Sequence, residues 1–437
     1  MALNRLDLTW SLAFLAGSCA QLLARFFRLP AVVVLLAVGL LIGRAGLDLV
    51  RPEVLGDGLA PLIGLLVSLV LFDGGLNLRL AGREQQRSAL QLVLVRSALG
   101  LVAAALFAHG LAGLSWTLAW VFGAIVLATG PTVVTPMVRQ MRLRAGLGQL
   151  LEAEGLMLEP FSAVLALLLL QLGLGDLSGW QDLASRLLLR LAGGSALGAG
   201  AGLVLAALLQ RLLPDPSVSS AATVGEVGVD GALEQGQSLA LQLSLGVLFV
   251  LFSGAEALLP ESGLPAAVTA GVVVGWRLGA RAVALDALIS QLAMLAITVL
   301  FPLLAADVAW SDLSPLGLGG LGCVLAVMGF RWVVIQVAGL GVDSLGWREK
   351  LILSWIAPRG IVTAAIASLF ALKLDGAGVP GGDELKGLVF LTILMTVGLQ
   401  GFTAPLLASR LDLLEPELDH GVAISPLPGE PAPEAAS

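Results

Sequence analysis

The chain is dominated by long apolar segments that carry almost no charge. Of its 437 residues 57% are hydrophobic and 13% are charged, whereas a soluble domain carries about 25% charge. About thirteen segments have the roughly 17 to 28 residues that a helix needs to cross a bilayer. They lie near 9–27, 30–49, 58–76, 89–111, 115–137, 147–174, 185–211, 238–259, 263–279, 283–305, 313–340, 350–372 and 386–408. The sequence therefore predicts an all-α polytopic membrane protein with about thirteen transmembrane helices.

Two polar stretches divide this pattern. Residues 212–237 are rich in Ser, Gly and acids, and predict a cytoplasmic linker between a seven-helix half (1–211) and a six-helix half (238–410). Residues 411–437 are rich in Pro, Ala and acids, so we expect a disordered cytoplasmic tail. The net charge of -7 comes largely from these two stretches. It gives no sign of a nucleic-acid partner.

Basic residues gather in the loops on one side of the predicted bundle, among them Arg139, Arg142, Arg144, Arg277 and Arg281. Short cytoplasmic loops are enriched in Lys and Arg. We therefore expect the N-terminus outside and the C-terminus in the cytoplasm, in the inner (plasma) membrane of a bacterium, with lipid around the helices.

Resident metals and catalytic groups are not indicated. Cys19 and Cys323 fall inside apolar segments as small filler, and no His/Cys/Asp cluster has transition-metal spacing, so we expect no cofactor. Gly173-Leu174-Gly175-Asp176 has the form used by intramembrane aspartyl proteases, but that chemistry needs a second, facing aspartate. Asp176 lies at a helix end, and a chain without tyrosine has no Tyr-Asp partner motif. The chain is therefore not expected to be an enzyme.

Two predicted helices contain helix-breaking residues at related positions. The fifth is interrupted at Thr129-Gly130-Pro131 and the twelfth at Pro358-Arg359-Gly360. Proline lacks a backbone donor and glycine tolerates unusual dihedral angles, so each helix can unwind near the middle of the membrane. The breaks are seven helices apart, an odd offset that predicts inverted repeats and a transporter site. The other interpretation is that Gly and Pro merely kink the two helices.

The sixth apolar segment, from about Leu147 to Leu174, contains Glu154 and Glu159. At about 1.5 Å per residue Glu159 lies roughly 18 Å into the helix, where a charge is costly. Five residues turn a helix by roughly 140°, so the two carboxylates need separate partners. Arg331, roughly 25 Å along the eleventh helix, stays protonated and requires an acid. We expect Glu154 to form a structural ion pair with Arg331, which leaves Glu159 to hold a proton or a small cation.

Three more charged residues occur in or near apolar segments. Asp73 ends the third segment in Leu71-Phe72-Asp73-Gly74-Gly75, where it either lines an ion pathway or is a carboxylate at a cytoplasmic helix end. Arg359 lies within the second break, where we expect it to balance carbonyl dipoles or an acidic side chain. Arg96 is only about eight residues into its helix, from which an arginine can reach the membrane surface, so we rank it lower.

At these residues the chain resembles the NhaP-type sodium/proton antiporters, the thirteen-helix branch of the monovalent cation:proton antiporters. The resemblance covers nearly everything before the tail. Its motifs are Gly123-Ala124-Ile125-Val126 leading to Thr129-Gly130-Pro131, the stretch from Glu154 to Glu159, and Ala357-Pro358-Arg359-Gly360-Ile361-Val362 continuing into Ala367-Ser368-Leu369-Phe370.

The resemblance implies a homodimer, with one domain for dimerisation and a core domain that moves to carry the ion. It places the ion site where the two broken helices cross, with Glu159 as the ion-binding acid and Thr129 as a hydroxyl or carbonyl ligand of Na⁺. It also assigns Glu154 and Arg331 as a buried pair, and matches Asp73 to an acidic residue of the third helix.

The chain departs from the family pattern at three positions. Gly130, beside Pro131, replaces the Asp of many relatives, and Leu158 replaces the motif Asn. Glu159 stands where the family has Asp, and its extra methylene bears on which cation fits.

A single free carboxylate that takes either one cation or one proton is the minimal chemistry of an antiporter. We therefore predict electroneutral exchange of a monovalent cation, Na⁺ before others, for H⁺ by alternating access, with Glu159 as the shared carrier. Potassium/proton exchange would use the same residues. A transporter that couples a cation to the uptake of an organic anion would need basic and amide groups for its substrate, and the predicted core is short of them. An inactive or regulatory homologue stays open.

Overall fold

The computed structural model of the protein describes residues 5–27, 29–78, 83–213, 227–340 and 345–415. Within these ranges the regular structure is helical, apart from one isolated bridge between Leu143 and Leu414. Eleven helical stretches are long and apolar enough to cross a membrane. The predicted all-α membrane fold is therefore confirmed. The count of about thirteen spans stays a prediction, because α2 and the α16–α17 segment fall outside those eleven.

The helices have the following bounds: α1 Arg5–Phe27, α2 Ala31–Ile42, α3 Leu59–Asn77, α4 Arg83–Val95, α5 Leu101–Gly110, α6 Trp116–Leu127, α7 Pro131–Met141, α8 Ala145–Leu174, α9 Trp180–Leu212, α11 Val227–Leu258, α12 Gly263–Leu278, α13 Ala282–Ala306, α14 Trp310–Leu313, α15 Gly317–Ala338, α16 Trp347–Trp355, α17 Ile361–Gly376, α18 Gly382–Met395 and α19 Gly401–Arg410. A π-turn, η2 (Arg96–Gly100), joins α4 to α5, and another, η5 (Thr396–Gln400), joins α18 to α19.

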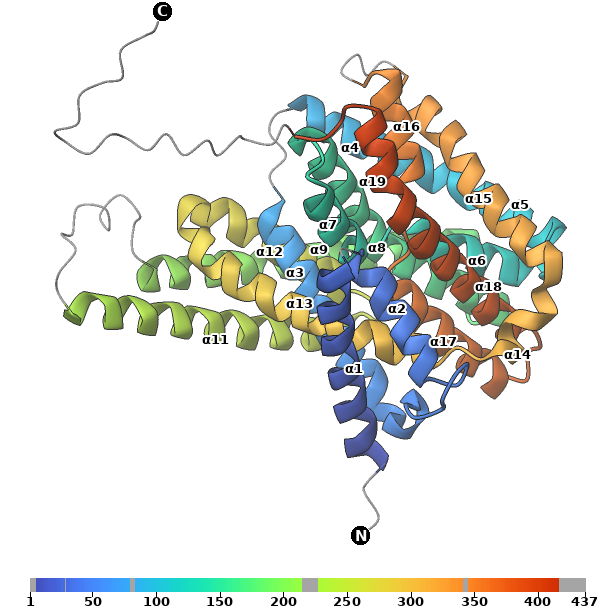
Figure 1. Ribbon diagram of the computed structural model, residues 1–437, viewed down its shortest axis with the longest axis horizontal. Helices are drawn as coiled ribbons and strands as arrows, with labels where there is room; N and C mark the ends of the chain where they lie inside the picture. The colour runs from blue at the N-terminus through green and yellow to red at the C-terminus, as the bar shows by residue number, and fades with distance from the viewer. Residues whose placement is uncertain (1–4, 28, 79–82, 214–226, 341–344, 416–437) are drawn as a thin grey trace, which may run out of the picture.

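The helices pack as two groups. In the first group α1, α2, α3, α9, α11, α12 and α13 pack on one another, and in the second group α4–α8 pack with α15–α19. Figure 1 shows the long α9, α11, α12 and α13 extending to one side and α15, α16, α18 and α19 to the other. The groups meet where α3 contacts α7, α8 and α17, where α13 contacts α17, and where α9 and α12 contact α8. The two predicted breaks thus belong to the second group.

The outer surface of the bundle is apolar. Leu188, Val250 and Leu318 are 68%, 74% and 85% exposed on α9, α11 and α15. A soluble protein rarely exposes apolar surface on this scale, whereas the acyl chains of a bilayer solvate it. The chain is an integral membrane protein.

Two boundaries differ from the sequence prediction. α11 begins at Val227 rather than at 238, so the last part of the predicted linker is helical, and residues 214–226 lie outside the described ranges. After α19 the backbone N–H of Glu415 donates to Arg142 (2.8 Å), and that of Arg144 donates to Leu413 (3.0 Å). Residues 411–415 are therefore ordered by pairing with the α7–α8 turn. Residues 416–437 of the predicted tail lie outside the described chain.

Candidate ion site at two interrupted helices

Both predicted helix breaks are present. α6 ends at Leu127 and α7 starts at Pro131, while α16 ends at Trp355 and α17 starts at Ile361. Pro131 occupies the first helical position, where its missing N–H costs nothing and its fixed φ suits the helix. The residues between the half-helices are extended, with ψ of 137° at Ala128 and 103° at Ile356.

The two breaks touch each other at glycines. The N–H of Gly130 donates to the carbonyl of Pro358 (3.0 Å). A Cβ on Gly130 would stand 2.3 Å from the Cα of Gly360. Only hydrogen fits between the two backbones, so a side chain at Gly130, the family's Asp included, requires a different spacing here.

Arginines satisfy the carbonyls that the breaks leave without helical partners. Arg331 donates from Nε to Leu353 (3.0 Å) and from Nη2 to Ile356 (3.1 Å), at the C-terminal end of α16. Arg359 donates from Nη1 to Ala128 (2.9 Å), at the C-terminal end of α6. An orphan carbonyl is costly at membrane depth. A cation also suits the negative end of a helix dipole, so these contacts hold the unwound segments open.

Glu154 is bound by two guanidinium groups. Arg331 grips both carboxylate oxygens, with Nη1–Oε1 at 3.0 Å and Nη2–Oε2 at 2.9 Å. Arg96 adds Nη1–Oε1 at 2.6 Å. The structure thus brings Glu154 and Arg331 together as predicted. The low rank given to Arg96 is wrong: its side chain turns inward from η2 and is only 4% exposed.

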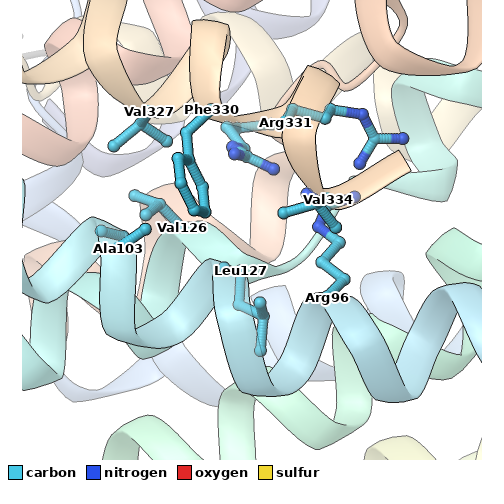
Figure 2. A pocket seen from close by; sticks show the side chains of 11 residues that line it. Arg96, Ala103, Val126, Leu127, Val327, Phe330, Arg331 and Val334 are labelled. Atoms are coloured by element: carbon cyan, nitrogen blue, oxygen red, sulfur yellow. The ribbon is translucent and has the colours of Figure 1, made fainter. Parts of the chain in front are cut away.

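The arginines gather at one small cavity of about 30 Å³, which Arg96, Phe330, Arg331, Val334 and Arg359 help to line. Figure 2 shows Arg96 reaching towards Val334 on α15, beside Arg331. A cavity of this size holds one water molecule. Within the described chain Arg359 makes no ion pair and its Nε has no hydrogen-bond partner. Guanidinium charge therefore exceeds carboxylate charge around Glu154.

Glu159 has no such partner. It is 0% exposed, and neither Oε1 nor Oε2 has a hydrogen-bond partner among the described residues. Its Oε1 lies 3.3 Å from the point where a Cβ on Gly360 would stand, which places it at the contact between the breaks. A buried acid without donors is unstable as a bare carboxylate, so it calls for a proton or a cation.

Near the starts of the half-helices three threonine hydroxyls are also buried without a hydrogen-bond partner among the described residues: Thr129, Thr132 and Thr363. Thr129, in the first break, turns its carbonyl to α8, where a Cβ on Gly155 would stand 3.1 Å from it. Thr129 was predicted from the sequence, whereas Thr132 and Thr363 were not. The available signal was their place just after Gly130-Pro131 and Gly360.

Asp73 lies between α3 and α13 and forms its hydrogen bonds there. Its Oδ1 accepts from Ser290 (2.6 Å) and from Asn77 (3.3 Å), and Asn77 also donates to Asp286 (2.5 Å). No hydrogen bond in the described chain joins Asp73 to Glu159 or Thr129. Asp73 is 8% exposed, so its carboxylate does not project into water from a cytoplasmic helix end. Its place along an ion pathway stays a prediction.

The remaining predicted site residue, Leu158, is fully buried in α8 and supplies no polar atom. Among the described residues no group of three or more His, Cys, Asp and Glu side chains forms a candidate metal site. Glu159 and the nearby threonines offer one carboxylate and several neutral oxygens, a ligand set that suits a monovalent cation.

Comparison with known proteins gives a consistent family. The sequence model described as "Sodium/hydrogen exchanger, transmembrane" matches residues 11–410. The chain is 24% identical over 420 residues to the Na(+)/H(+) antiporter ApNhaP of Aphanothece halophytica, covering 91% of this chain and 73% of that protein. It is 26% identical over 384 residues to the K(+)/H(+) antiporter NhaP2 of Shewanella oneidensis, covering 85% of this chain and 61% of that one.

A solved structure has the same fold. The sodium proton antiporter MjNhaP1 of Methanocaldococcus jannaschii, determined at pH 8, superposes with a TM-score of 0.73 at 23% identity, over 93% of this chain and 99% of that one. The family match spans both interrupted helices and the helix that carries Glu154 and Glu159. The chain therefore belongs to the sodium/hydrogen exchanger family, and its resemblance to the NhaP-type antiporters is confirmed.

Proposed function

We propose that the protein exchanges one monovalent cation, Na⁺ before others, for one proton across the membrane, with Glu159 as the shared carrier. The observation that supports this is the contrast within α8. Glu154 is neutralised by arginines, whereas Glu159 is equally buried and has no partner among the residues that the structure describes. A single such acid binds either one cation or one proton, so the exchange is electroneutral.

Alternating access follows from the position of Glu159. The acid belongs to the second helix group, and exchange requires it to meet each side of the membrane in turn. We assign the second group as the moving core and the first as the dimerisation domain of a homodimer, as the resemblance implies. The N-terminus outside and the C-terminus in the cytoplasm belong to the same proposal.

Potassium/proton exchange is the second candidate. Its support is the K(+)/H(+) antiporter NhaP2 among the relatives, together with a site that offers one formal charge. Fewer anionic ligands weaken the preference for a small, strongly hydrated cation, because dehydration must be offset by the ligands.

The test uses inside-out vesicles that contain the full chain and carry a respiration-driven proton gradient. Addition of NaCl, LiCl or KCl, each in its own potassium-free or sodium-free buffer, should collapse the gradient in a saturable way. Vesicles with Glu159→Gln should show no response. Absence of a response to all three cations in wild-type vesicles would refute exchange, and full exchange in Glu159→Gln would remove Glu159 from it.

A further inference from the structure

We propose that the hydroxyl of Thr132 is a direct ligand of the transported cation, supplying at this site an oxygen that residue 130 of this chain does not provide. The proposal rests on the proposed function and names one more atom of the same site. It assigns a role to a residue on α7 that neither the sequence motifs nor the carboxylates indicated.

A buried threonine in a membrane helix normally donates its hydroxyl to the carbonyl four residues earlier. In the described chain three buried threonines do so: Thr298 to Met294 (2.8 Å), Thr392 to Leu388 (2.8 Å) and Thr396 to Thr392 (2.7 Å). Thr132 is 1% exposed, yet its Oγ1 has no partner in the described chain. It is an exception that needs a physical reason.

The reason is the helix break. Thr132 is the second residue of α7, so the carbonyl four residues earlier belongs to Ala128, which lies in the extended break and accepts from Arg359. The carbonyl three residues earlier, on Thr129, is turned towards Gly155 on α8. Unwinding therefore removes both local acceptors and leaves the hydroxyl free for something else.

The free hydroxyl points to the same place as the free acid. From the position of a Cβ on Gly360, the Thr132 Oγ1 lies 2.9 Å away and the Glu159 Oε1 lies 3.3 Å away. The same point is 2.7 Å from the Gly130 Cα, so both oxygens lie at the contact between the two breaks. A buried hydroxyl left unsatisfied costs about 1–3 kcal/mol. A bound cation would offset part of this cost by taking a lone pair of the oxygen, and a bound water would do so by donating a hydrogen bond to it.

Because residue 130 is a glycine, it supplies no side-chain ligand, and the cation needs an oxygen from another residue. Gly130 offers no side chain, and its contact with Gly360 leaves no room for one. One carboxylate cannot coordinate a cation alone, since alkali cations take about six oxygens. Neutral hydroxyl and carbonyl oxygens complete such a shell without adding charge, which keeps one proton equivalent to one cation.

The experiment compares Thr132→Val, which keeps the shape and removes the oxygen, with Thr132→Ser, which keeps the oxygen. Initial rates of gradient collapse are measured in inside-out vesicles at several concentrations of NaCl, LiCl and KCl. The valine variant should raise the apparent KM for its preferred cation roughly tenfold and change the ratios of KM among the three cations. Its maximal rate should stay within about twofold, and the serine variant should match the wild type.

The matched control is Thr392→Val, which removes an equally buried hydroxyl that is bonded to its own helix. It should leave KM and the cation ratios unchanged. A general packing defect would lower the maximal rate of both valine variants and leave the ratios alone. Unchanged KM and ratios in Thr132→Val, in vesicles where the wild type exchanges and Glu159→Gln does not, would overturn the role of Thr132 and leave the proposed function intact.

A second measurement separates ligand loss from misfolding. Purified wild-type protein in detergent should show a rise in its thermal unfolding midpoint as NaCl or KCl replaces choline chloride at constant ionic strength. Thr132→Val should have the wild-type midpoint in choline and a smaller rise with the cation. A full cation-dependent rise in Thr132→Val would contradict ligation. Absence of both exchange and a rise in the wild type would overturn both proposals.

Discussion

Glu154 and Glu159 lie five residues apart on α8, 1% and 0% exposed, yet their surroundings are opposite. Glu154 receives three guanidinium contacts from Arg96 and Arg331, while Glu159 receives none. The roughly 140° of rotation between them on the helix decides this difference, because one side meets Arg96 from η2 and Arg331 from α15, and the other meets the helix breaks. Depth alone therefore does not identify a functional acid; the supply of donors does.

The largest expected effect is on exchange by Glu159→Gln. The amide cannot release a proton or neutralise a cation, so cation-dependent collapse of the gradient should fall to the background of empty vesicles. The unfolding midpoint should remain within a few degrees of the wild type, since no partner is stranded. Glu159→Asp is the control, and should retain exchange with a changed cation dependence. A Glu159→Gln protein that loses its fold would contradict the contrast with Glu154.

Glu154→Gln should act in the opposite way. It leaves Arg96 and Arg331 buried without a countercharge, which costs about 3–5 kcal/mol. Reversible unfolding in detergent should show this loss together with a lower expression level. The double variant Glu154→Gln/Arg331→Gln should be less destabilised than the sum of its single variants, because the two changes remove one interaction. Additive losses would mean that the pair contributes little.

The two arginines should not be equivalent. Arg331→Lys loses the two-pronged contact with Glu154 and the contacts to Leu353 and Ile356, so it should cost about 2–3 kcal/mol. Arg96→Lys can keep its single contact to Oε1, and should cost about 1 kcal/mol. Unfolding free energies of the two variants at one pH measure the difference, and an equal loss would assign the same role to both.

Glu261, outside the membrane-spanning stretches and between α11 and α12, offers an intermediate case. Burial, with a smaller contribution from Glu256, raises the pKa of Glu261 to about 7. Because this folded pKa exceeds the unfolded value of 4.5, the folded state should lose stability as pH rises from about 4.5 to about 7. Glu261→Gln should flatten that part of the stability profile by no more than about 2 kcal/mol. A profile identical to the wild type would mean that Glu261 ionises freely.

Much of this arrangement could be predicted from the sequence, because a charged side chain deep in the membrane needs either a partner or a function. Arg331 required an acid, and Glu154 was the one that left Glu159 free. Helix breaks were predicted at Gly130-Pro131 and at Pro358-Arg359-Gly360, and both breaks are present. Backbone chemistry and charge are local properties that a sequence states directly.

The parts that could not be predicted depend on how elements approach one another. Arg96 is close enough to its helix start to reach the surface, but η2 turns it onto Glu154. Thr132 looks like any helical threonine until the break removes its acceptor. Asp73 accepts a hydrogen bond from Ser290, which lies 217 residues later in the chain. Residues 227–237 form the first part of α11 but were predicted as linker, because their Gly and acidic residues favour loops over helix.

The contact between Gly130 and Gly360 also limits how the protein can move. Two backbones joined by a hydrogen bond and separated only by hydrogen atoms cannot slide past each other without a clash. Each break is in turn tied by arginine to the end of a half-helix, so α6–α7 and α16–α17 have no independent mechanical freedom at this point. If the core moves along the membrane normal, as proposed, we expect both interrupted helices to move as one body and the oxygens between them to keep their mutual distances.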